Sequence, residues 1–190
     1  MSKRRRREQR ETSLDRRGPH REERRVYLVV CEGETEKRYF DTMKKHPDVR
    51  LHTVHARKAK HLQREIVVRS AAEAKRDDCT ELWAVFDTDG EDVTALVAAA
   101  ARGGIETAPS TPAFETWLIL HLRDHRSALV TAARAERELR ALLPRWSKGG
   151  TRFEDFAHGL EDACERAGRL PPTGDPSTRI HQLIRALTRP

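Results

Sequence analysis

Cysteine is scarce in this chain and follows no pairing pattern. Cys31, Cys79 and Cys164 are odd in number, far apart and outside any CxxC pair. This argues against a disulfide framework and against a structural zinc site, and a reducing compartment fits it. We predict that Cys31 is a small buried residue at the end of a strand.

Long hydrophobic runs are also missing. No apolar stretch approaches the roughly 20 residues that cross a bilayer. The basic N-terminal segment is not followed by the hydrophobic segment of a secretory signal. We therefore expect a cytoplasmic protein that has no membrane partner.

Several catalytic motifs are absent as well. The sequence has no GxxxxGK[ST], no GxGxxG and no serine nucleophile elbow, so it carries no P-loop of its own. His52 and His55 are three residues apart on a predicted strand. They would point to opposite faces of the strand and make a poor metal pair.

The chain has an excess of positive charge, and most of this excess lies in one segment. The chain has 190 residues and a net charge of +7, and residues 1–25 hold eleven lysines and arginines against five acids, a net charge of +6. We predict that residues 1–24 form a basic, disordered tail, because such a segment buries too little apolar surface to fold alone. It either binds phosphates through counterion release or serves as a solvated extension.

Apolar runs alternate with helical patterns in the first part of the chain after this tail. Strands are predicted at 26–31, 49–56, 82–86 and 105–109, with helices from about 35 to 45, over 62–76 and over 91–102. This order predicts an α/β core over residues 25–110, with a parallel sheet flanked by helices. Residues 111–190 are predicted to be a helical part packed on this core, with helices at 112–122, 128–143, 152–168 and 177–188.

Acidic side chains follow two of the predicted strands. Glu32 comes after the first strand, and Asp87 and Asp89 come after the third. Ligands of parallel α/β sheets bind outside the carboxyl ends of the strands, where these acids would converge. Crowded carboxylates repel one another, and a divalent cation removes that repulsion. Oxygen ligands favour Mg²⁺ or Mn²⁺, so we predict a metal site at Glu32, Asp87 and Asp89.

These acids also have plain structural interpretations. An Asp after a strand is common in turns and helix caps. On this interpretation Glu34 is solvated, and Glu36 only favours the dipole of the first helix. Glu91 and Asp92 fit the first turn of the next helix, and we assign them that role.

Glu115 is more informative, because its neighbours one turn along the helix are Leu118 and Ile119. A carboxylate on an apolar helix face is costly unless it is paired or bound to metal. It is either a structural acid held by an arginine or a member of the active site, and we favour the second. His121 shares a face with Trp117, and we expect it to pack or cap.

Basic residues near the acids are candidates for binding a nucleic-acid backbone. Arg57, Lys58 and Lys60 are predicted on the loop that leaves the second strand, on the same edge of the sheet as the acids. A solvated turn is the alternative. Lys148 is a further candidate for the same role.

These motifs together resemble a known family. A buried strand that ends in Glu-Gly, followed by a strand that ends in DxD, is similar to the Toprim domain of topoisomerases, primases and OLD-type nucleases. More closely, the chain resembles the RloB-like family of bacterial proteins. The matching segments are residues 31–36 with Tyr39 and Phe40, then 85–89, 112–121, and 175–178 with His181 and Leu183.

The resemblance implies a Toprim-like core, Mg²⁺ or Mn²⁺ at Glu32, Asp87 and Asp89, and a role in restriction or anti-phage defence beside a separate ATPase. The leading hypothesis is a metal-dependent nuclease acting on DNA or RNA, with Glu115 supporting the site. One alternative is a non-catalytic nucleic-acid-binding partner that recruits or regulates an ATPase. Another is a nucleotidyl transferase that acts on small nucleotides.

Overall fold

A computed structural model describes residues 25–49, 51–59, 64–73 and 79–188. The predicted tail and Lys60 lie outside these residues. The sheet has five strands in the order β2-β1-β3-β4-β5. The strands are β1 (Val26–Cys31), β2 (Thr53–Lys58), β3 (Glu81–Asp87), β4 (Glu106–Thr111) and β5 (Ser177–Thr178). All neighbours pair in parallel except β5, which pairs antiparallel with β4. The predicted fold class is confirmed.

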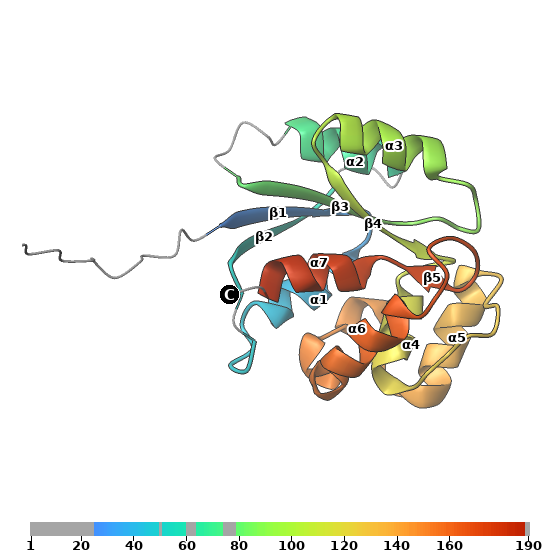
Figure 1. Cartoon of the computed structure of the whole chain (residues 1–190). Helices are drawn as coiled ribbons and strands as arrows, with labels where there is room; N and C mark the ends of the chain where they lie inside the picture. Colours follow the sequence, from blue (N-terminus) through green and yellow to red (C-terminus); the bar gives the residue numbers. More distant parts are fainter. Residues whose placement is uncertain (1–24, 50, 60–63, 74–78, 189–190) are drawn as a thin grey trace, which may run out of the picture.

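Helices cover both faces of the sheet (Figure 1). On one face lie α2 (Arg64–Glu73) and α3 (Thr94–Arg102). On the other lie α1 (Glu34–Met43) and α7 (Ile180–Thr188), with the rest of the helical part beyond them. That part consists of α4 (Glu115–Leu122), α5 (Ala132–Leu142), α6 (Leu160–Gly168) and the short 3₁₀ helices η2 (Lys148–Gly150), η3 (Phe153–Asp155) and η4 (Ala157–Gly159).

The two covered faces explain the unbroken apolar runs of β1 and β3. Successive side chains of a strand point to opposite faces. Val29 and Val85 therefore join the larger core cluster with α1 and the helical part, while Val30 and Ala84 join the smaller cluster under α2 and α3. A strand buried on both sides carries apolar residues at every position.

Helix α4 lies at the centre of the larger cluster. Every residue from Glu115 to His121 is buried, so the helix is enclosed on all sides. Trp117 packs there with Tyr27 of β1 and Leu183 of α7 in one continuous core. The helical part and the sheet thus share their main hydrophobic core.

Several boundaries differ from the sequence prediction: α3 begins at Thr94 rather than at residue 91, α5 begins at Ala132 rather than at residue 128, and α6 begins at Leu160 rather than at residue 152. Strand β2 begins at Thr53 rather than Val49, and it includes Arg57 and Lys58, which were predicted on a loop. Helix α4 begins at Glu115 rather than Pro112, whose peptide bond with Thr111 is cis. Residues 177 and 178 form β5 instead of starting the last helix.

No helix within the described ranges combines the length and the hydrophobicity needed to span a bilayer.

Candidate acidic site at the carboxyl edge of the sheet

Glu32 and Asp87 meet where the two central strands end. Glu32 directly follows β1, and its backbone N–H donates to the carbonyl of Val85 on β3 (2.9 Å). The backbone N–H of Asp87 in turn donates to Oε2 of Glu32 (3.1 Å). The pairing of β1 with β3 therefore fixes these two acids beside each other, as the sequence predicted.

Asp87 also connects the sheet to the helical part. Its Oδ1 accepts a hydrogen bond from the backbone N–H of Phe114 (2.8 Å). Phe114 immediately precedes α4, so this contact brings the first residue of α4, Glu115, to the carboxyl edge. The side chain of Glu115 is buried with only 2% of the residue exposed. Glu115 thus joins the site from a separate element.

Glu36 is a fourth acid of this site, and the sequence interpretation missed it. It lies in the first turn of α1 and is 3% exposed. Its buried Oε2 has no hydrogen-bond partner among the described residues. A Cβ on Gly33 would collide with that oxygen, so the glycine leaves room for the carboxylate. We call Glu32, Glu36, Asp87 and Glu115 the acid cluster.

A signal for Glu36 was present in the sequence. Tyr39 and Phe40 lie three and four residues further along α1, and both are buried. Residues at this spacing share a helix face. The argument that singled out Glu115 from its apolar neighbours therefore applied equally to Glu36.

The acid cluster has unusual electrostatics. Burial raises the pKa of Asp87 well above its ordinary value, and the negative charges of Glu36 and Glu115 raise it further. Burial, followed by the charges of Glu115 and Glu32, raises the pKa of Glu36 to about 7. The site therefore favours the uptake of positive charge, whether as protons or as a cation.

Lys148 supplies one positive charge at this site. Its Nζ lies 3.4 Å from Oε1 of Glu115 and 3.5 Å from Oε2 of Glu136 on α5. Partial burial disfavours the charged amine, but these two carboxylates prevail and raise the pKa of Lys148. Burial still raises the pKa of Glu115, because Lys148 offsets only part of the effect.

Asp89 lies on the exposed turn after β3 and not in the buried cluster. Its φ of 51° is in the left-handed region, and its backbone N–H donates to the carbonyl of Pro112 (3.0 Å). Glu91 and Asp92 are exposed too, and Asp92 accepts from the N–H of Thr94 (2.8 Å) at the start of α3. Both residues therefore precede α3 rather than lying in its first turn, where the sequence predicted them.

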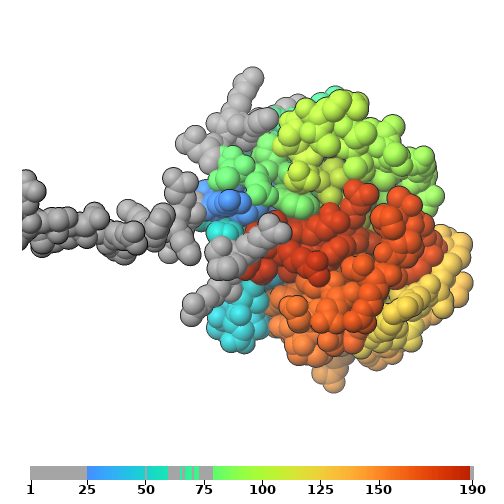
Figure 2. Space-filling model, viewed as in Figure 1, coloured from blue at the N-terminus to red at the C-terminus, as the bar shows by residue number. Residues whose placement is uncertain are grey.

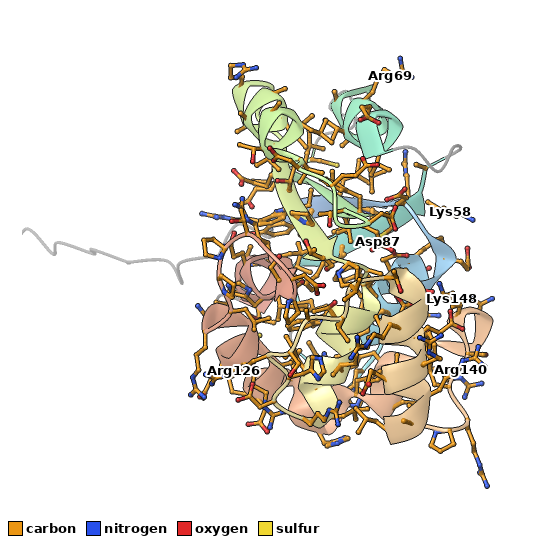
Figure 3. All side chains as sticks on the ribbon, turned by 90° about the vertical axis from the view of Figure 1, so that its right-hand side faces the viewer. Lys58, Arg69, Asp87, Arg126, Arg140 and Lys148 are labelled. Carbon is orange, nitrogen blue, oxygen red and sulfur yellow. The ribbon has the colours of Figure 1, made fainter. Side chains whose placement is uncertain are left out.

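The basic candidates lie at the rim of the site. Arg57 and Lys58 are exposed and pair in register with Val30 and Cys31, immediately before Glu32. Figure 3 looks onto the carboxyl edge of the sheet and shows Asp87 with Lys58 and Lys148 to either side of it. Lys60 lies outside the described residues.

Two other residues have structural roles. His121 is buried, its Nε2 lies 3.0 Å from the Tyr39 hydroxyl and its Nδ1 lies 2.8 Å from the Phe156 carbonyl. Burial lowers the pKa of His121 to about 3, so the ring is neutral. Cys31 is fully buried, and burial raises the pKa of its thiol. Both residues pack as the sequence predicted.

The donor set of the acid cluster suits a hard divalent cation. Within the part of the chain that the structure describes, no three His, Cys, Asp or Glu side chains form a ready-made metal site. Mg²⁺, however, usually takes only one or two protein carboxylates and completes its shell with water and substrate phosphate. The buried and unpartnered oxygen of Glu36 fits such a cation. The predicted metal ligands Glu32, Asp87 and Asp89 remain a prediction.

The fold and this site together define an α/β protein with a buried acidic centre at the carboxyl edge of a mostly parallel sheet. The family model described as "RloB-like protein" matches residues 27–187. The chain therefore belongs to the RloB-like family, as its motifs indicated. No curated protein and no solved structure matches the chain.

Proposed function

We propose that the protein is a metal-dependent nuclease that hydrolyses phosphodiester bonds of DNA or RNA. The observation that supports this is the acid cluster. Four carboxylates at the ends of β1 and β3 and the starts of α1 and α4 are held together, although burial raises the pKa values of three of them and mutual repulsion raises those of Glu36 and Asp87 further. Such an arrangement costs stability, and perturbed carboxylates gathered at a strand edge are typical of functional sites.

The acids have distinct roles in this proposal. Glu32, Asp87 and Asp89 would hold Mg²⁺ or Mn²⁺. Such a cation, when bound, would neutralise charge on the phosphate and lower the pKa of bound water. Glu36 has a free buried oxygen and a pKa of about 7, which suits a group that accepts a proton at neutral pH.

The basic residues bind the substrate backbone. Lys148 lies against Glu115 and is about half exposed, so its amine can reach a phosphate at the site while it limits the repulsion among the acids. Arg57 and Lys58 extend the positive surface along the end of β2. Bound phosphates would contact these side chains through charge-assisted hydrogen bonds.

The biological context that we propose is cytoplasmic restriction or anti-phage defence alongside a separate ATPase. Membership of the RloB-like family supports this context, and the lack of a P-loop in the sequence agrees with an ATPase on another chain.

Cleavage assays with a matched pair of variants test the nuclease proposal. We expect the purified chain with Mn²⁺ or Mg²⁺ to nick plasmid DNA or to degrade RNA. Asp87→Asn should abolish this activity, because it removes a carboxylate charge at the centre of the cluster. Asp48→Asn, at a side chain that is 87% exposed, should retain it. If wild type and Asp87→Asn are equally inert on every DNA and RNA tried, the proposal fails.

A non-catalytic nucleic-acid-binding partner of an ATPase is the second candidate. The lack of a ready-made three-ligand metal group among the described residues favours it. Calorimetry with Mg²⁺ and Mn²⁺ separates the two functions. Binding that is lost in Asp87→Asn supports the nuclease, whereas nucleic-acid binding with no metal uptake supports the regulatory role.

A further inference from the structure

The outer face of α5 carries a basic surface that is separate from the acid cluster. Residues 132–152 hold six lysines and arginines against two acids, a net charge of +4, in a chain whose net charge after residue 25 is only +1. Ala135 and Leu139 bury the inner face of α5 in the larger core cluster. The opposite face is left to the solvent, and in Figure 2 the yellow segment that contains α5 lies at the right-hand edge of the molecule.

Three arginines follow one another across this outer face. Arg134, Arg137 and Arg140 are exposed and lie three residues apart, a spacing at which side chains of a helix are neighbours. We call them the arginine strip. Arg134 and Arg137 form no ion pair with any described residue, since both glutamates of α5 pair with other basic residues. Arginines clustered along one helix face are the electrostatic footprint of a surface that binds nucleic acid.

Ion pairs connect the arginine strip to the acid cluster. Arg140 donates to Oε1 of Glu136 (2.7 Å), and the other oxygen of this carboxylate lies 3.5 Å from Nζ of Lys148. The same Nζ lies 3.4 Å from Oε1 of Glu115 in the acid cluster. The guanidinium carbon of Arg140 also lies 5.9 Å from the ring centre of Trp146, which helps to fix its position. The strip therefore ends beside the acid cluster, and Figure 3 shows Arg140 next to Lys148 in the view onto the carboxyl edge.

We propose that the arginine strip binds the sugar-phosphate backbone of a nucleic acid, which runs along the outside of α5 to reach the acid cluster. This inference rests on the proposed function and names the surface that guides the substrate. Guanidinium groups bind phosphates through paired hydrogen bonds. The only large hydrophobic side chain that is exposed among the described residues is Val130, so the strip has no exposed aromatic ring on which bases could stack. Its contacts are therefore with the backbone and carry no preference for base sequence.

Binding in EDTA tests this inference without any need for cleavage. The probes are a duplex and a single-stranded oligonucleotide of mixed sequence, measured by fluorescence anisotropy with the full chain at several salt concentrations. Arg134→Gln/Arg137→Gln removes two charges from the strip. Arg102→Gln/Arg126→Gln removes two charges at the end of α3 and at a residue that Figure 3 shows on the opposite side of the helical part from Arg140. We expect the strip variant to bind the tighter probe about tenfold more weakly than the control variant, with the slope of log K against log salt reduced by about 2.

A third variant separates the charge of the strip from the integrity of α5. Arg134→Lys/Arg137→Lys keeps both charges at exposed positions and should keep the slope of wild type. The inference is overturned if neither probe binds wild type, if the glutamine variant of the strip binds as its control does, or if the lysine variant loses slope equally. These results are independent of the cleavage assay. Binding through α5 without cleavage supports the strip alone, whereas cleavage with equal binding by the strip variant and its control supports the nuclease alone.

Discussion

At the scale of single residues, Glu36 has the clearest consequence for stability. Its pKa rises from the ordinary value of 4.5 to about 7 in the folded protein. The unfolded chain therefore releases this proton at lower pH than the folded chain does. The stability that the protonated acid provides is complete below about pH 4.5, and it is lost as pH rises through about 7.

Glu36→Gln should remove much of this pH dependence. In metal-free buffer at pH 8, we expect the variant to be more stable than wild type by about 1–3 kcal/mol, because glutamine keeps the shape without the buried charge. Urea unfolding at pH 5 and pH 8 measures the change. Glu34→Gln, at an exposed position in the same helix turn, is the control and should follow wild type. Equal losses of stability in wild type and Glu36→Gln between the two pH values would contradict the prediction.

Lys148 is expected to contribute one ionic contact to nucleic-acid binding. Lys148→Met should weaken the affinity for a single-stranded oligonucleotide and reduce the slope of log K against log salt by about 1. Titrations at several salt concentrations measure this slope. Lys45→Met, at an exposed lysine after α1, keeps the total charge of the variant the same and serves as the control. Identical slopes for the two variants would mean that Lys148 makes no ionic contact with the nucleic acid.

At the scale of elements, the close approach of η4 to the end of α4 is sensitive to one methyl group. A Cβ on Gly159 would collide with the backbone carbonyl of His121. We expect Gly159→Ala to destabilise the protein by about 1–3 kcal/mol through overpacking. Gly149→Ala, which has open space around it, should stay within about 0.5 kcal/mol of wild type. Thermal unfolding compares the two, and similar melting temperatures would refute the close packing.

The elements also show what could be predicted from the sequence. The ends of β1 and β3 were predictable because their apolar runs stop at charged residues, and this was enough to place Glu32 and Asp87 together. The short strand β5 was not predictable, because two residues carry no periodicity. They pair with β4 only because Ser110 and Thr178 meet in the tertiary fold.

Long-range contacts account for most of what the sequence left open in the site. Lys148 of η2, which packs against α1, lies beside Glu115 of α4 only in the tertiary fold, and no local pattern indicates that pairing. Glu36 was different, because its burial was indicated by Tyr39 and Phe40. The sequence thus indicated some members of the acid cluster. It did not indicate that Lys148 of the helical part would lie against them.

At the scale of the whole molecule, the sheet and the helical part depend on one shared core. Phe114 and Trp117 of the α4 region pack with Val29 and Val85 of the central strands. A fragment of residues 25–110 would expose that face of the sheet. We expect the fragment to show no cooperative unfolding transition, whereas residues 25–190 should show one. Calorimetry distinguishes the two, and a cooperative transition in the fragment would mean that the α/β core folds alone.

The position of Asp87 between Glu32 and Phe114 has a consequence for the newly made protein. The acids Glu32 and Asp87 are translated early, but the backbone N–H that holds Asp87 and the side chains of Glu115 and Lys148 are translated later. Helix α7, which completes the core, comes last. The acidic centre is therefore assembled only after Lys148 has been made. For the proposed nuclease, a growing chain that ends before Lys148 would lack the complete acidic centre.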